Sequence, residues 1–153
     1  MDHYEDKHVL IVGSAGIDVK GRPDYQLDSA ISDYAITSQI SADYLNARKS
    51  LFTDAAMVVI DANLEDGALK ALFRLAQRAK VPVCADPTAA SLAGRLLPYL
   101  NRIYLITPNL AEAAVLCEEP MPVPDAELAL GAAQKLLERG VRCVPSVLCQ
   151  LLS

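Results

Sequence analysis

Residues 103–112 have the sequence Ile-Tyr-Leu-Ile-Thr-Pro-Asn-Leu-Ala-Glu, which joins an apolar segment to the start of a helix. The apolar part is typical of a buried parallel strand, which is a short run rich in Val, Ile and Leu. Pro108 ends this segment, and Asn109 and Glu112 fall in the first turn of the helix that follows. Strand followed directly by helix predicts an α/β fold, in which ligands bind beyond the carboxyl ends of the strands.

Asn109 and Glu112 have two interpretations. Asn is a favoured helix N-cap, and a Glu three residues later completes a capping box, so both residues could be purely structural. The same two side chains would also lie at the ligand-binding edge of a parallel sheet, where polar groups can do chemistry. Capping and ligand binding do not exclude each other.

The alternation of apolar strand and amphipathic helix recurs along the chain. Strands are predicted over 8–12, 56–60, 81–85, 103–106 and 141–144, and helices over 65–80, 88–97, 109–118 and 125–139, with short helices between 40 and 52. With right-handed crossovers this order predicts a parallel sheet with helices on both faces. Pro98 is expected to limit the 88–97 helix, and Leu130 and Leu137 are expected to face the core.

An Asp or Asn follows four of the predicted strands: Asp18, Asp61, Asp86 and Asn109. In one parallel sheet these strand ends share an edge. Carboxylates gathered there would suit a hydroxyl-bearing substrate or a magnesium-bound phosphate. Asp is also a common cap in strand-to-helix loops, so the pattern leaves a ligand site and simple capping both open.

The segment 13–19, Gly-Ser-Ala-Gly-Ile-Asp-Val, follows the first strand with small residues and one acid. Such a segment can bring backbone close to a ligand. It can equally be an ordinary turn in which Gly13 and Gly16 supply unusual φ angles and Asp18 caps the turn. It is not a dinucleotide-binding fingerprint, because no GxGxxG leads into a helix.

Composition excludes several classes of protein. The 153 residues are 52% hydrophobic, which indicates one globular domain, and the net charge of −5 with 14 scattered Lys and Arg argues against nucleic acid as a partner. No apolar run approaches the roughly 18 residues of a membrane span, and the polar start is unlike a signal peptide, so a cytoplasmic location is expected. Four cysteines without a CxxC pair predict no zinc site.

Three segments resemble the PfkB, or ribokinase-like, carbohydrate kinases, and within them the pseudouridine kinases. Residues 9–19 are similar to the family's first strand and Asn-x-Asp sugar-binding turn, with Gly16 where the family usually has Asn. Residues 38–87 resemble its central sheet. Residues 107–112 match its Asn-x-x-Glu motif, which is associated with magnesium and phosphate.

The resemblance implies a three-layer ribokinase-like fold and transfer of the ATP γ-phosphoryl group to a sugar or nucleoside hydroxyl, with pseudouridine as the first substrate. It implies that Asp18, Gly16 and Asp61 bind the substrate. It also implies that Asn109, Glu112 and Asp86 lie near the phosphate and Mg²⁺, with Glu112 contacting the metal through water. The implied cofactors are ATP and Mg²⁺. The implied partner is a small sugar or nucleoside, with neither nucleic acid nor membrane.

The chain departs from the family in ways that bear on activity. Family members are about twice as long, so residues 8–153 are expected to form a single incomplete domain, in which 18–33 replace the lid and the glycine-rich region. The Gly-Ala-Gly-Asp motif, whose Asp is the family's general base, is absent from the sequence, and with it the nucleotide-binding half, so no catalytic residue is assigned. A weak or inactive polypeptide that self-associates through exposed sheet edges is therefore expected.

Two alternatives remain from the sequence. One is a non-catalytic α/β remnant or ligand-binding module. The other is a flavodoxin-like domain with an unrelated ligand, although no phosphate-binding loop supports it.

Overall fold

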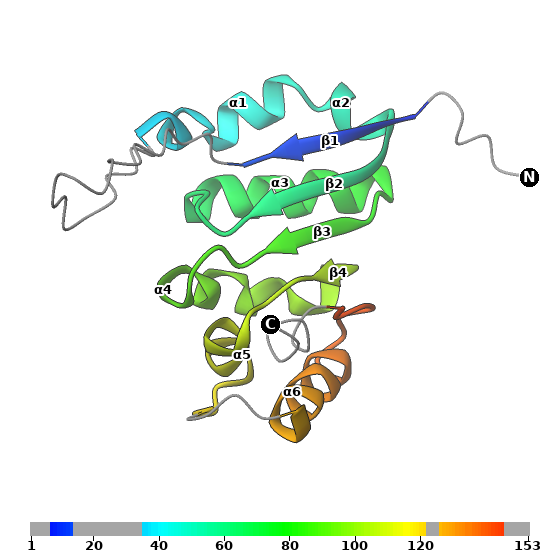
Figure 1. The fold of residues 1–153 in the computed structure, drawn as a ribbon. Coiled ribbons are helices and arrows are strands. Elements are labelled where there is room, and N and C mark those ends of the chain that lie inside the picture. Colours follow the sequence, from blue (N-terminus) through cyan, green and yellow to red (C-terminus); the bar gives the residue numbers. More distant parts are fainter. Residues whose placement is uncertain (1–6, 14–34, 122–125, 146–153) are drawn as a thin grey trace, which may run out of the picture.

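The computed structural model describes residues 7–13, 35–121 and 126–145. These residues contain a parallel sheet in the order β1 (His8–Val12), β2 (Ala55–Asp61), β3 (Val83–Asp86) and β4 (Leu105–Ile106) (Figure 1). The predicted fifth strand is reduced to one bridge between Leu105 and Cys143. The predicted α/β fold is confirmed, and each strand except the fifth lies within a few residues of its predicted place.

The helices follow the predicted alternation. They are η1 (Ala35–Gln39), α1 (Ala42–Ala47), α2 (Ser50–Thr53), α3 (Asp66–Ala79), α4 (Ala90–Ala93), η2 (Gly94–Arg102), α5 (Leu110–Cys117) and α6 (Ala126–Glu138), where η marks a 3₁₀-helix. Figure 1 shows α3 behind the strands, and α1 and α2 pack against α3. Among the described helices, none has the length and apolar character needed to cross a membrane.

The strand order explains why these helices share one face of the sheet. Each strand pairs with the next one in sequence, and right-handed crossovers that all advance in the same direction place their helices on the same side. The described helices that connect the strands therefore lie on one face of the sheet. The sequence predicted helices on both faces.

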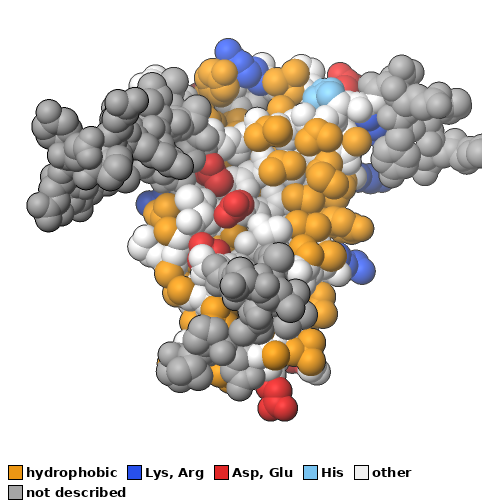
Figure 2. Space-filling view, viewed as in Figure 1, with side chains coloured by type: hydrophobic (Ala, Val, Ile, Leu, Met, Phe, Trp, Pro, Cys, Tyr) orange, Lys and Arg blue, Asp and Glu red, His pale blue; other side chains and the backbone are white. Residues whose placement is uncertain are grey.

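Alternate residues of β1 and its neighbour β2 point to opposite faces of the sheet, and their exposure differs. Val58 and Ile60 of β2 are buried, whereas Val9 and Ile11 of β1 are 55% and 74% exposed. The register pairs Ile11 with Val59, whose side chain is half-buried. Figure 2 shows hydrophobic side chains gathered over the strands on this face. The second face is apolar and open in the described part of the chain.

Helix α3 provides the centre of the core, as its amphipathic pattern predicts. Leu69, Leu72 and Phe73 are each at most 1% exposed. The Phe73 ring stacks on Tyr99 of η2, with centroids 4.3 Å apart and planes 5° apart. This pair ties α3 to the segment between β3 and β4.

The helix expected over 88–97 is wrong in both form and length. The structure has the short helix α4 followed by η2, which continues through Pro98 to Arg102. A proline φ near −65° fits a 3₁₀-helix, and the missing N–H costs only one bond in a short helix. Pro98 therefore does not end the helical segment.

The expected burial of Leu130 and Leu137 is also wrong. They are 61% and 46% exposed, while α6 buries a narrow stripe of Ala129, Ala132 and Leu136. Among the described elements α6 packs mainly on α5, so one narrow face suffices. The helix ends before Gly140, which has the expected positive φ of 102°.

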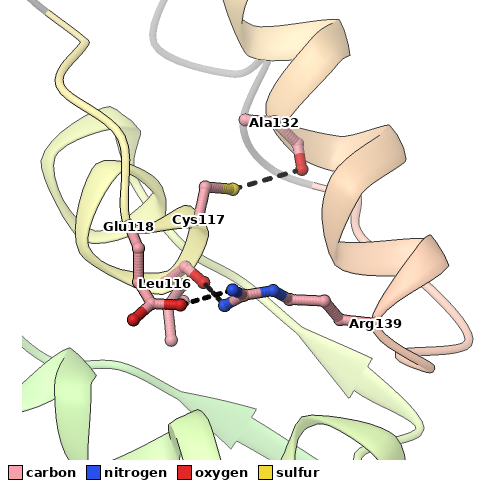
Figure 3. A network of polar contacts seen from close by, with 5 residues as sticks. All are labelled: Leu116, Cys117, Glu118, Ala132 and Arg139. Carbon is pink, nitrogen blue, oxygen red and sulfur yellow. Dashed lines mark hydrogen bonds and ion pairs between the residues drawn. The ribbon is translucent and has the colours of Figure 1, made fainter.

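Polar contacts fix α6 against α5 (Figure 3). Nη1 of Arg139 donates to the Leu116 carbonyl at 2.7 Å, and Nη2 pairs with the Glu118 carboxylate. The Cys117 thiol donates to the Ala132 carbonyl at 3.6 Å. Arg139 thus binds the carbonyl end of α5, where a cation is favoured.

Candidate functional site

The carboxyl ends of the described strands meet at one edge, as predicted. Asp61 and Asp86 are direct register partners at the ends of β2 and β3. The Ala62 amide donates to the Asp86 carbonyl at 2.9 Å, and the Thr107 amide donates to the Ala85 carbonyl at 3.3 Å. Asp61, Asp86 and Asn109 therefore follow three neighbouring strands.

Asp61 is half-buried at the end of β2. Its Oδ1 accepts a hydrogen bond from the Asn63 amide at 3.0 Å, which closes a turn after the strand. Its Oδ2 occupies the space beside Gly13, 2.6 Å from where a Cβ on that glycine would lie. The carboxylate thus bridges from β2 toward the end of β1.

Gly13 does not have the unusual φ that the turn interpretation assigns to it. Among the described glycines only Gly140 has a positive φ. The absence of a side chain at Gly13 matters because of the nearby Asp61 carboxylate, a contact that the sequence pattern did not reveal. Gly16 and Asp18 lie outside the described residues.

Asp86 is exposed and caps its own turn. Its Oδ1 accepts from the Thr88 amide at 2.7 Å, and Thr88 has a φ of 67°, which a β-branched residue rarely adopts. The carboxylate therefore has a structural role in holding this turn. Because Asp86 is exposed, its carboxylate is also accessible to solvent at this edge of the sheet.

Asn109 and Glu112 form the predicted capping box at the start of α5. The Glu112 amide donates to Asn109 Oδ1 at 2.9 Å, and the Asn109 amide donates to Glu112 Oε2 at 2.9 Å. Asn109 Nδ2 also donates to Glu112 Oε1 at 2.7 Å. Glu112 is only 4% exposed, and Asn109 is half-buried. The capping interpretation is confirmed for both residues.

The described part of this edge offers few side chains to a magnesium ion. The described residues contain no cluster of three or more His, Cys, Asp or Glu side chains placed to hold a metal. Magnesium is commonly held by one or two carboxylates together with waters and substrate phosphates, so such a cluster is not required. Each carboxylate oxygen has two acceptor sites, so the capping box leaves Glu112 able to accept from a metal-bound water. A magnesium ion at this edge would therefore be held through water rather than by a cluster of carboxylates.

Two surface depressions lie away from this edge. One, of about 400 Å³, lies between η2 and the α5–α6 pair and is lined by residues that include Asn101, Glu118 and Arg139. The other, of about 240 Å³, lies at the opposite end of β3 near Gln77 and Arg102. Neither includes any of the predicted site residues.

Residues 15–144 match the sequence model of the pfkB family carbohydrate kinases. The chain belongs to this family. The match covers most of the chain and includes the strand-end edge, so the resemblance found in the sequence is confirmed.

Two curated relatives from Escherichia coli strain K12 match only part of the chain, at low identity. The chain is 32% identical over 93 residues to the uncharacterized sugar kinase YeiI, covering 61% of this chain and 25% of that protein. It is 34% identical over 87 residues to pseudouridine kinase, covering 57% of this chain and 27% of that protein. The chain therefore spans about a quarter of the length of these relatives.

Solved structures support the ribokinase-like fold. A carbohydrate kinase from Agrobacterium tumefaciens superposes with a TM-score of 0.61 at 24% identity, covering 77% of this chain and 36% of that one. The ATP and Mg²⁺ complex of an Escherichia coli protein assigned as ribokinase II superposes with a TM-score of 0.56 at 15% identity, covering 74% and 39%. At these identities the likeness shows the fold alone.

Proposed function

We propose that this chain is part of an ATP-dependent kinase that phosphorylates a sugar or nucleoside hydroxyl, with pseudouridine converted to pseudouridine 5′-phosphate as the first candidate reaction. The observation that supports this most is the alignment of Asp61, Asp86 and the Asn109–Glu112 pair at one sheet edge in a PfkB family member. The similarity to pseudouridine kinase supports the substrate. The homologous complex with ATP and Mg²⁺ supports the cofactors.

The proposed roles follow from position at this edge. Asp61, together with Gly16 and Asp18, would bind hydroxyls of the substrate. Glu112 and Asp86 would face the phosphate side, with Glu112 holding a water of the metal shell and Asn109 fixing the Glu112 carboxylate. Bound magnesium would neutralise charge on the phosphates, and phosphoryl transfer depends mainly on such neutralisation and on positioning.

We propose that the polypeptide alone turns over slowly or not at all. The sequence has no Gly-Ala-Gly-Asp motif. The family resemblance implies that this motif supplies both the general base and the anion hole. General-base catalysis contributes about 10²- to 10⁴-fold. Loss of an oxyanion-type donor costs about 10²- to 10³-fold. Residues 8–153 would then serve as one part of a PfkB domain.

A non-catalytic binding module is the second candidate. The observation in its favour is that Asp86, Asn109 and Glu112 all have structural hydrogen bonds that explain their presence without a substrate. On this alternative the edge would bind a sugar or nucleoside without transferring phosphate.

The experiment that separates these proposals measures ATP-dependent phosphorylation of pseudouridine, ribose and adenosine. It compares this chain with a chimaera in which the chain is joined to the motif-bearing segments of Escherichia coli pseudouridine kinase. Turnover by the chimaera on any of the three substrates supports the kinase. Binding without turnover by the chimaera supports the binding module, and neither binding nor turnover contradicts both.

A further inference from the structure

Gly13 stands at the end of β1 beside the Asp61 carboxylate, and its backbone does not explain why it is glycine. Its φ lies outside the left-handed range that favours glycine, so alanine could adopt the same backbone. The space around it gives the explanation. A Cβ at Gly13 would lie 2.6 Å from Oδ2 and 3.2 Å from Cγ of Asp61, and real Cβ contacts are almost never shorter than 3.0 Å.

Asp61 itself is held from the other side. Its Oδ1 accepts from the Asn63 amide at 3.0 Å, so the carboxylate has one oxygen fixed on its own loop and the other over Gly13. A methyl group at position 13 would push on a carboxylate at the end of a side chain that can rotate. The expected result is displacement of the carboxylate, at the expense of the Asn63 bond, without loss of the fold.

We propose that Gly13 is a positioning residue, whose missing side chain lets the Asp61 carboxylate lie across the ends of β1 and β2. The strand register supports this arrangement, because Val12 pairs with Ile60 and so places the residues that follow them side by side. A ligand hydroxyl at this edge would donate a hydrogen bond to the Asp61 carboxylate, which lies between the ends of the two strands. This last step rests on the proposed function, whereas the positioning of Asp61 does not.

The test uses NMR on the chain and its Gly13→Ala, Asp61→Ala and double variants. The reporters are the Asp61 carboxyl carbon and the Asn63 amide. We expect Gly13→Ala to shift both signals. In the Asp61→Ala background, adding Gly13→Ala should leave the Asn63 amide signal unchanged. Unchanged Asp61 and Asn63 signals in Gly13→Ala would overturn the proposal.

Gly67→Ala in α3 is the matched control, because nothing lies within 4 Å of a Cβ at that position. It should move neither reporter. If Gly13→Ala fails to fold, recovery of folding in the double variant supports the proposal, because the clash is then removed. Failure of the double variant to fold would overturn it.

A titration with pseudouridine and with ribose separates this inference from the proposed function. In the wild-type chain either ligand should shift the Asp61 carboxyl signal, and Gly13→Ala should weaken that binding about tenfold or more, as for a lost charge-assisted hydrogen bond. Equal binding by both proteins would overturn the positioning role. If neither ligand shifts the wild-type signal while Gly13→Ala displaces the carboxylate, the positioning of Asp61 stands and its proposed role in substrate binding fails.

Discussion

Asn109 donates two hydrogen bonds to the buried Glu112 carboxylate, one from its amide at 2.9 Å and one from its side chain at 2.7 Å. The Glu112 amide returns a third bond to Asn109 Oδ1. The Asn-x-x-Glu segment is therefore the N-terminal cap of α5. The structural and the proposed functional role depend on the same carboxylate.

The first prediction concerns the structural role of this pair. Asn109→Ala should lower the free energy of unfolding by about 1 kcal/mol, in the range of lost N-caps. Glu112→Ala should lower the free energy of unfolding by about 1–3 kcal/mol, because it leaves partly buried N–H groups of Asn109 without their acceptor. Urea denaturation measures both changes.

Glu65→Ala is the control for the capping prediction. Glu65 is the N-cap of α3 but is exposed and makes no side-chain cap bond, so its replacement should change stability by less than about 0.5 kcal/mol. Equal losses at Glu65 and Glu112 would contradict the energetic role of the capping box.

A second prediction compares two adjacent leucines of α6. Leu136 is fully buried and Leu137 is 46% exposed. Leu136→Ala should lower the free energy of unfolding by about 2–5 kcal/mol, while Leu137→Ala should change it by less than about 1 kcal/mol. Thermal or urea unfolding of the two variants checks this, and a larger effect at Leu137 would show that α6 is rotated from the described position.

These leucines illustrate what the sequence can and cannot predict. Local periodicity located β1 and α3 because the pattern of apolar residues is set by the core that each element faces. The same periodicity placed Leu130 and Leu137 in the core, because it cannot say how wide a stripe the neighbouring element will cover. The width depends on α6 packing mainly on α5, which is tertiary information.

The candidate site also contains features that the sequence predicts and features that it does not. Asp61, Asp86 and Asn109 could be predicted to share an edge, because parallel strand ends lie together once the strands are identified. The space that Gly13 leaves for Asp61 could not be predicted, since it depends on how neighbouring strands are aligned. The path of η2 through Pro98 was missed because proline usually marks a helix end.

A third prediction concerns the cysteines. Burial raises the pKa of the Cys84 thiol, and nearby Cys143 raises it further. Burial also raises the pKa of Cys117, with Lys135 and Arg139 opposing this shift and Glu119 adding to it. At mildly alkaline pH both residues should therefore carry less thiolate and react more slowly with iodoacetamide than in the unfolded chain.

Peptide mapping by mass spectrometry measures these rates against the same chain in urea. The sign for stability follows from the raised pKa values: the fold favours the neutral thiols, so this contribution is present below the unfolded pKa and is lost as pH rises through the folded pKa. Unfolding free energy should fall in that alkaline range, and by less in Cys117→Ala. Protection that persists in urea would contradict burial as its cause.

A fourth prediction concerns the open face and edge of the sheet. Val9 and Ile11 are exposed on the outermost described strand, and exposed apolar strands of this kind favour association. The chain should self-associate with rising concentration, and Ile11→Lys should reduce this association. Sedimentation velocity measures it.

Leu130→Lys is the control for association, because Leu130 is 61% exposed on α6, away from the sheet. It should leave the association unchanged. A wild-type chain that stays monomeric at every concentration, or an equal effect of Leu130→Lys, would contradict association through the sheet.

The central claim is that the edge of the sheet carrying Glu112 handles magnesium and phosphate in addition to capping α5. Its most direct test is the Mg²⁺ dependence of pseudouridine phosphorylation by the chimaera described above, with and without Glu112→Gln. The glutamine oxygen can still accept the capping-box hydrogen bond from the Asn109 amide, but the variant loses the negative charge and the second acceptor, which Asn109 Nδ2 uses in the wild-type chain. The account predicts a folded variant that needs about tenfold or more Mg²⁺ for half-maximal rate, as for other groups that act on a metal through a bound ligand. An active, folded variant with unchanged Mg²⁺ dependence would show that Glu112 is only a cap.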